Sequence, residues 1–372
     1  MNASVKLGKI LGIPIGLHTS WFLVFGLVTL SLSTGYIAQE YPQLSTISHW
    51  SLGLVTSLLF FGSVLLHELG HSIIALRNRI PVKGITLFIF GGVAQINREP
   101  DSPGVEFRIA VAGPLVSLGL AIWFGFFSFL GNQIEIIQAS STYLMRINLM
   151  LAIFNLIPGF PLDGGRILRA LIWKWTNSYQ RATKIASTSG QVIAFGLIGY
   201  GILSIFTGQF SNGLWLAFIG WFLQNAAAST TQQLKVQEKL RGVTVEQAMS
   251  RECVEIPGLT TINQLIQERV VPYGQRCFFV TDFAGELRGL LTLEDISRIP
   301  QQKWRFTTAE HLMTPLNKLE LVDANTELLA ALKTMENANL FQVPVVHQNR
   351  PVGLLSREQV IRYMNFKPQL GM

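Results

Sequence analysis

The sequence SVLLHELGHSIIAL, residues 63–76, places His67, Glu68 and His71 inside an apolar stretch. Residues 41–66 contain no Asp, Glu, Lys or Arg, so the three polar residues lie in a segment that is predicted to cross a membrane. Ionisable groups at this depth are costly without partners and therefore indicate a functional site. A single membrane His more often makes a packing hydrogen bond. Two His residues four apart on one helix face, with Glu68 beside them, instead favour a zinc ion and metal-assisted hydrolysis.

The composition indicates an integral membrane protein with room for one soluble module. Charged residues make up 14% of the 372 residues, compared with about 25% in soluble domains. The net charge of +7 is concentrated in residues 1–231, which hold 13 Lys and Arg against 7 Asp and Glu. Residues 232–372 hold 16 against 15, so we expect no direct nucleic-acid partner.

Apolar segments define the expected membrane topology. Six are long enough to cross about 30 Å of hydrocarbon, and they cover residues 17–34, 51–76, 105–131, 143–160, 188–207 and 213–231. Residues 1–16 are interpreted as part of a retained first helix, not as a cleaved signal peptide. Lys and Arg gather in every second connection, with Arg146 as the exception, which predicts cytoplasmic N- and C-termini.

The segment GITLFIFGGVAQIN, residues 84–97, is too short to span as a helix and is rich in β-forming residues. Its two apolar runs flank Gly91-Gly92, which favours a hairpin turn at that dipeptide. The open edge of such a hairpin offers backbone groups that can pair with an extended substrate. A hairpin that only packs against the helices is an equally good interpretation.

Asp163 is the candidate for a third metal ligand, because catalytic zinc normally has three protein ligands. It lies in NLIPGFPLDGGR, residues 155–166, and has no evident cation four residues away. Pro161 prevents a continuous helix, and Gly164-Gly165 permit close backbone approach. Asp163 can alternatively be the N-cap of a helix over residues 167–175.

Together, HELGH and NLIPGFPLDGG resemble the intramembrane site-2 proteases, and most closely the bacterial and archaeal branch that carries CBS domains. The resemblance implies Glu68 as the catalytic acid/base, Asn155 as a polar group near the scissile carbonyl, and three zinc ligands, His67, His71 and Asp163. It also implies a multi-pass protein of a prokaryotic-type cell membrane that acts in regulated intramembrane proteolysis. The substrate class is a single-pass membrane protein: a transcription factor, a sigma-factor precursor or an anti-sigma factor.

Residues 112–117 correspond to another family segment, in which Ser117 stands where many relatives have Asn. This replacement weakens the case for a polar role at Ser117, and a helix kink at Gly113-Pro114 is sufficient to explain the segment.

The polar half contains a tandem repeat. Met249 and Met313 are 64 residues apart, as are Gly289 and Gly353. Each unit is predicted as helix, strand, strand, helix, and the two together resemble a CBS-domain pair. The expected domains are a protease domain (1–231), a linker (232–242), CBS repeat 1 (243–300) and CBS repeat 2 (301–372). The predicted fold class is therefore an α-helical polytopic membrane protein of about six transmembrane helices, with a short membrane-associated β-hairpin and an α/β CBS pair.

CBS pairs often bind adenosine nucleotides, so the resemblance implies a site for ATP, ADP or AMP at Thr292 and Asp295. Ser356 is the counterpart in the second repeat, but Gln359 replaces its Asp, which leaves only the first site complete. A structural role, with a homodimer formed through the CBS domains, is the alternative. Cys253 and Cys277 are expected to be free thiols.

The resulting prediction is a zinc-dependent intramembrane endopeptidase. A CBS-regulated membrane transporter or channel is the alternative from another class. Transporters generally contain internal repeats of their spans, and residues 1–231 show no such repeat in sequence.

Overall fold

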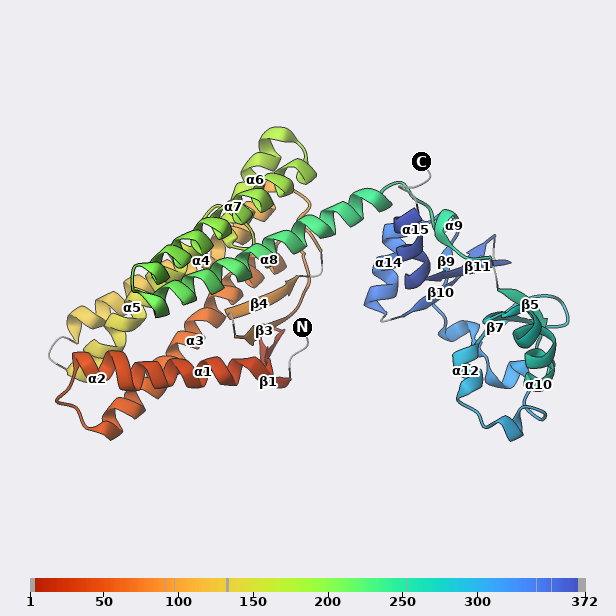
Figure 1. Cartoon of the computed structure of the whole chain (residues 1–372), viewed down its shortest axis with the longest axis horizontal. Helices are drawn as coiled ribbons and strands as arrows, with labels where there is room; N and C mark the ends of the chain where they lie inside the picture. Colours follow the sequence, from red (N-terminus) through yellow and green to blue (C-terminus); the bar gives the residue numbers. More distant parts are fainter. Residues whose placement is uncertain are drawn as a thin grey trace. The chain divides into compact units, whose positions relative to one another are not determined.

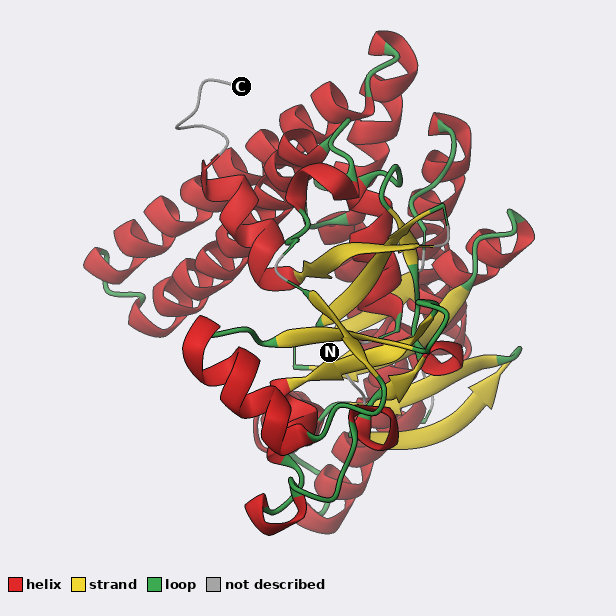
Figure 2. Ribbon diagram, turned by 90° about the vertical axis from the view of Figure 1, so that its right-hand side faces the viewer, coloured by secondary structure: helices red, strands yellow, loops and turns green. Residues whose placement is uncertain are grey.

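The computed structural model describes residues 4–89, 91–96, 98–131, 134–251, 253–338, 340–348 and 350–366. The chain divides into two compact units, Met1–Gln232 and Gln233–Met372 (Figure 1). The first unit is built mainly from long helices, and the second mixes short helices with small sheets. Figure 2 shows the helices in red and the strands in yellow.

The long helices of the first unit follow the apolar segments. They are α1 (Thr19–Ser31), which continues through a π-helical turn (Leu32–Tyr36) into α2 (Ile37–Glu40), then α3 (Thr46–Arg77), α4 (Pro103–Leu130), α5 (Glu135–Asn155), α6 (Asp163–Thr176), α7 (Tyr179–Phe206) and α8 (Phe210–Leu240). Within the described residues, five helical segments are long and apolar enough to cross a membrane: Thr19–Glu40, Thr46–Arg77, Pro103–Leu130, Glu135–Asn155 and Tyr179–Phe206. The polytopic helical fold is confirmed.

Five of the six expected spans correspond to these segments. The expected sixth span, residues 213–231, lies within α8, which is not among the five apolar segments. Polar residues such as Gln224 and Asn225 interrupt its apolar run. Helix α8 also extends to Leu240 and so covers most of the predicted linker.

Residues 1–16 do not belong to the first helix, contrary to the prediction. The described part forms strands β1 (Val5–Ile10) and β2 (Ile13–Leu17). Leu11 and Gly12 connect them with φ values of 52° and 80°, which suits a type I′ turn. Ile13 and Ile15 are buried against Leu69 of α3. The period-2 alternation of IPIGL was the signal that could have identified this strand.

The sheet of the first unit has the order β1-β2-β3-β4. Strand β2 pairs in parallel with β3 (Val82–Phe88), which forms an antiparallel hairpin with β4 (Gly91–Ile96). The hairpin predicted within residues 84–97 is therefore present, although Phe90 and Asn97 lie outside the described residues. Strand β4 is the last in the sheet order.

The turn of this hairpin is not at Gly91-Gly92, contrary to the prediction. Phe88 pairs with Gly91 and Leu87 pairs with Gly92, so both glycines belong to β4. A Cβ atom at Gly92 would collide with the side chain of Glu68. Glycine is needed here because the strand backbone lies directly on a helix side chain.

The second unit contains two similar repeats, in each of which a short helix precedes a β–α–β–β–α order, and the second repeat has an additional strand, β8, after its short helix. The first consists of α9 (Val245–Ala248), β5 (Val254–Pro257), α10 (Ile262–Leu265), a π-helical turn (Ile266–Val270), α11 (Val271–Tyr273), β6 (Cys277–Thr281), β7 (Leu287–Thr292) and α12 (Leu293–Ser297), followed by a 3₁₀ turn (Gln301–Lys303). The second consists of α13 (Ala309–Leu312), β8 (Thr314–Pro315), a 3₁₀ turn (Leu316–Lys318), β9 (Val322–Asp323), α14 (Leu328–Asn337), β10 (Gln342–His347), β11 (Arg350–Ser356) and α15 (Arg357–Phe366). Each repeat thus adds a parallel first strand to the predicted order.

Each repeat contributes a segment near its start to the sheet of the other repeat. Strand β8 of the second repeat pairs with β7 of the first, and Ser250 forms a bridge with Leu354 of β11. A Cβ at Gly289 would lie 2.5 Å from the Thr314 carbonyl oxygen, and one at Gly353 would lie 2.5 Å from that of Ser250. The repeated glycines are therefore required for this reciprocal strand pairing.

Cys253 and Cys277 form a disulfide, with Cα atoms 4.9 Å apart, which contradicts the expectation of two free thiols. The parallel register of β5 and β6 pairs Val254 with Phe278. The residues that precede them, the two cysteines, are therefore side by side. This strand pairing is a tertiary feature that cysteine spacing alone does not reveal.

Candidate metal centre

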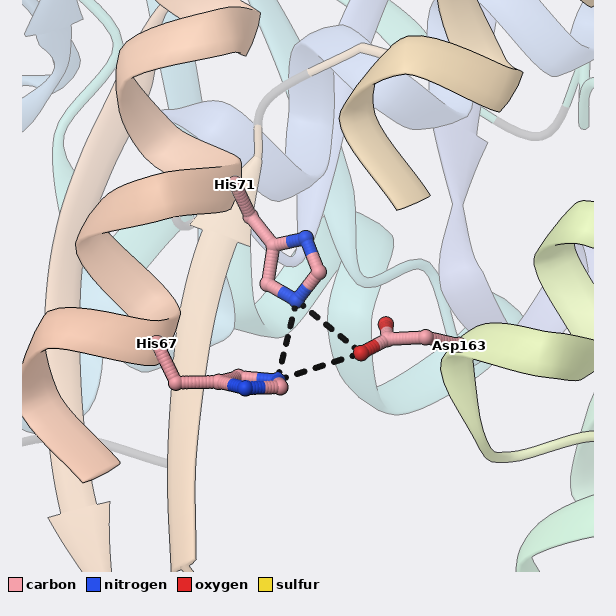
Figure 3. A group of neighbouring side chains, drawn as sticks. All are labelled: His67, His71 and Asp163. Atoms are coloured by element: carbon pink, nitrogen blue, oxygen red, sulfur yellow. Dashed lines mark hydrogen bonds and ion pairs between the residues drawn. The ribbon is translucent and has the colours of Figure 1, made fainter. Parts of the chain in front are cut away.

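His67 and His71 project from one face of α3, as their four-residue spacing predicts (Figure 3). Their Nε2 atoms are 3.2 Å apart, and each residue is only 4% exposed. The helix thus brings two imidazole nitrogens together in a buried position within an apolar span.

Asp163 reaches this pair from the start of α6 (Figure 3). Its Oδ2 lies 3.1 Å from Nε2 of each histidine. The N-cap of the helix is Leu162, so Asp163 occupies the first helical position instead of the cap. Gly164 and Gly165 let the helix start here, because a Cβ on either would collide with backbone atoms of residues 156–160.

Helix α4 orients both imidazoles. Nδ1 of His71 donates to the carbonyl oxygen of Ile109 at 2.7 Å, and Nδ1 of His67 is hydrogen-bonded to Oγ of Ser117 at 2.9 Å. Such partners fix the ring orientation of metal-binding histidines. Ser117 therefore makes a polar contact with a histidine of the site, which the interpretation of this segment as a kink did not include.

Gly113 lies against the site. A Cβ atom there would overlap with the imidazoles of both His67 and His71. Gly113 and Ser117 are four residues apart and share a face of α4. Pro114 lies inside α4, as expected for a kink at Gly113-Pro114, but Gly113 also borders the metal-binding side chains. The four-residue spacing of Gly113 and Ser117 was the signal in the sequence that both residues contact the same neighbouring helix.

The three side chains fit a zinc ion. Ligands about 2.0–2.1 Å from a tetrahedral zinc are roughly 3.3–3.4 Å from one another, and here the three ligand atoms are 3.1–3.2 Å apart. A carbonyl oxygen only accepts, so His71 in its neutral form carries its proton on Nδ1 and presents a lone pair at Nε2. Buried lone pairs that face a carboxylate oxygen repel it unless a cation lies between them.

Glu68 lies beside the metal-binding face, between α3 and the sheet. It is half-buried, and its carboxylate accepts a hydrogen bond from the backbone N–H of Ala94 in β4. Gly92 of the same strand packs against its side chain. The edge strand and the proposed base are thus in direct contact.

Comparison with known proteins agrees with this geometry. The model for peptidase family M50 matches residues 55–141 and 131–197, and the CBS domain model matches residues 309–365. A Synechocystis protein with the name "Putative zinc metalloprotease sll0528" is 38% identical over 369 residues, which cover 97% of this chain and 96% of that protein. The chain belongs to the M50 family of site-2 proteases.

Two further relatives come from Methanocaldococcus jannaschii. The zinc metalloprotease MJ0392 is 30% identical over 369 residues, covering 98% of this chain and 97% of its own. The solved structure of a site-2 protease from this organism is 33% identical and covers 61% of this chain and 94% of that one, with a TM-score of 0.42. Membership of the M50 family makes the protein a zinc metalloprotease and an integral membrane protein, which disfavours the transporter alternative.

The other predicted residue of this site-2 protease, Asn155, is the last residue of α5. Its Nδ2 donates to the carbonyl oxygen of Leu151 at 3.0 Å, within the same helix. Its role near a scissile carbonyl stays a prediction.

The candidate nucleotide residues of the CBS repeats have local partners. The backbone N–H of Thr292 donates to Asp295 Oδ2 at 3.0 Å, and Asp295 N–H donates to Thr292 Oγ1 at 3.3 Å, which forms a capping box for α12. Ser356 and Gln359 make the same reciprocal bonds, at 3.2 and 2.8 Å, at the start of α15. Gln359 therefore preserves the cap although it replaces Asp.

Proposed function

We propose that this site-2 protease hydrolyses a peptide bond in the transmembrane segment of a membrane-anchored protein, at a zinc ion held by His67, His71 and Asp163. The observation that carries the proposal is the approach of Asp163 Oδ2 to within 3.1 Å of both imidazole nitrogens inside the membrane unit. Two buried histidines and a carboxylate are a common ligand set of catalytic zinc.

The zinc ion, Glu68 and Asn155 would have distinct tasks. Zinc, when bound, supplies a Lewis acid that lowers the pKa of water from about 15.7 to about 7. Glu68 accepts the proton of the attacking water and passes it to the leaving amine. Asn155 would donate a hydrogen bond to the substrate carbonyl once its side chain leaves the carbonyl oxygen of Leu151.

The substrate must be extended before it is cut, because the peptide bonds of a helix are shielded by their own hydrogen bonds. Strand β4 ends the sheet order and supports the idea that the substrate adds to it as a further strand. The contact of Gly92 with Glu68 would bring such a strand next to the base. A sheet that only packs against α3 is the competing interpretation.

The family acts on membrane-protein substrates in the bilayer. For this chain we propose a regulatory substrate: a transcription factor, a sigma-factor precursor or an anti-sigma factor. We also propose that both termini are cytoplasmic, with α8 as the sixth span, because Lys and Arg occupy alternate connections.

We further propose that the CBS pair modulates proteolysis by binding ATP, ADP or AMP at Thr292 and Asp295, with Ser356 as the second-repeat counterpart. A structural role is the alternative. The two motifs cap their helices, and the CBS domains can form a homodimer. A cavity of about 870 Å³ in this unit is lined by other residues, including Thr281, Arg288 and Glu310. Calorimetry on the full chain decides: absence of heat with all three nucleotides would remove the sensor role.

The catalytic proposal is tested with Glu68→Gln. The variant keeps the three ligands and should retain stoichiometric zinc, while cleavage of a single-pass substrate in lipid vesicles falls by roughly 10²–10⁴-fold. Glu135→Gln, an exposed change at the start of α5, is the matched control with unaltered cleavage. Undiminished proteolysis by the Glu68 variant would refute the mechanism, and the inactive variant can also trap the substrate for identification.

A further inference from the structure

A second buried polar cluster joins the helices that build the metal centre. Arg169 lies on α6, six residues after Asp163, and is only 8% exposed. Its Nε donates to Oε1 of Glu106 at 2.7 Å, and its Nη2 contacts the same oxygen. Glu106 belongs to the first turn of α4 and is fully buried.

Aromatic groups hold the guanidinium of Arg169 from two sides. Its Cζ lies 4.8 Å from the ring centre of Phe160 and 4.7 Å from that of Tyr179. Nη1 also donates to the hydroxyl of Tyr179 at 2.7 Å. Phe160 lies in the loop that leads into Asp163, so the arginine contacts both the helix and the loop that position this carboxylate.

Global stability is a poor explanation for this pair. A buried ion pair is often no more stabilising than apolar residues of similar volume, because both charges lose their hydration. Oε2 of Glu106 also has no hydrogen-bond partner among the described residues. The pair connects α4, which orients His67 and His71 and borders the site at Gly113, with α6, which carries Asp163.

We propose that the Glu106–Arg169 pair is a positioning device for the metal centre. It holds α6 against α4 at the register in which Asp163 meets the two imidazoles. Within the described part of the chain, neither residue makes a hydrogen bond or ion pair with His67, His71 or Asp163, so both act through the placement of helices. The inference rests on the zinc site proposed above and extends it to residues outside the HELGH and LDGG motifs.

The test is cobalt titration of the full-length protein, with Glu106→Gln as the main variant. Co²⁺ absorption reports the number and geometry of the ligands independently of proteolysis. We expect the dissociation constant for Co²⁺ to rise by roughly 10–100-fold, as for other groups that support metal ligands, together with an altered absorption spectrum. Arg108→Gln is the matched control, since this exposed arginine of the same α4 turn contacts Asn78 and not α6.

A purely structural role makes a different prediction. It would lower the unfolding temperature of the metal-free protein and leave the Co²⁺ affinity and spectrum of the folded variant unchanged, which would overturn the proposal. Should Glu106→Gln fail to fold, Arg169→Lys is the second variant. It keeps the charge but lacks the planar guanidinium that lies over the rings of Phe160 and Tyr179 while it donates twice to Glu106, so wild-type Co²⁺ binding by it would also overturn the proposal. Failure of the wild-type protein to bind Co²⁺ would instead refute the zinc site itself.

Discussion

Two motifs in this protein, HELGH with its downstream Asp163 and the Thr292–Asp295 pair of the CBS unit, differ in where their side chains find partners. His67 and Asp163 are 96 residues apart and meet in a buried place between helices. Thr292 and Asp295 bond to each other within one turn and cap α12. In the first arrangement the metal-ligand atoms converge and need a cation between them. In the second, hydrogen bonds within one helical turn already satisfy both side chains.

The comparison shows when a motif is evidence for a ligand. Reciprocal hydrogen bonds at a helix start contribute to stability whether or not anything binds. Buried imidazole lone pairs and a carboxylate that come from separate helices have no such local explanation. They repel each other unless a cation lies between them. The metal centre is therefore supported by geometry, and nucleotide binding at the CBS pair depends on direct measurement.

The largest effect is expected from Asp163→Ala. Removal of the carboxylate leaves two histidine ligands, so we expect loss of stoichiometric zinc and of proteolysis. Zinc is measured by mass spectrometry of the purified protein. Asp101→Ala, which removes an exposed carboxylate paired with Arg98, should leave the zinc content unchanged. Full zinc occupancy in the Asp163 variant would exclude this residue as a ligand.

Gly113→Ala should weaken metal binding almost as much. The added Cβ would overlap with both imidazoles and displace their Nε2 atoms from Asp163. The matched control is Gly119→Ala on the same helix, where a Cβ meets no atom within 4 Å. Zinc affinity by chelator competition compares the two, and equal affinities would show that α4 does not border the site as described.

Ser117→Ala should have an intermediate effect. The alanine cannot hydrogen-bond to His67 Nδ1, so the ring loses its orientation, and zinc affinity should fall by roughly 10–100-fold. Ser117→Thr keeps the hydroxyl and should restore most of the affinity. An alanine variant with wild-type affinity would mean that the hydrogen bond does not orient the ligand.

The smallest effect is expected in the CBS unit. Thr292→Ala removes the cap of α12 and should lower the free energy of unfolding of this unit by about 1 kcal/mol, with no nucleotide present. Thr292→Ser preserves the cap and should unfold like the wild type in a urea titration. A much larger loss that nucleotide reverses would show that the motif serves a ligand as well as the fold.

Local patterns in the sequence predicted a large part of this molecule. The four-residue spacing of HELGH places both histidines on one helix face, since that face is a property of the helix itself. Apolar length predicted five of the membrane helices, and the 64-residue period predicted the tandem repeats. The hairpin near residues 84–97 also followed from local composition.

Only the tertiary structure decided the features that depend on contacts between distant segments. Ser117 and Gly113 of α4 contact histidines of α3. Gly92 lets strand β4 pack directly on Glu68, and strand pairing brings Cys253 next to Cys277. The approach of Asp163 to both imidazoles is of the same kind. Sequence periodicity reports which face of an element a residue occupies, but the partner of that face is set by how helices and strands pack.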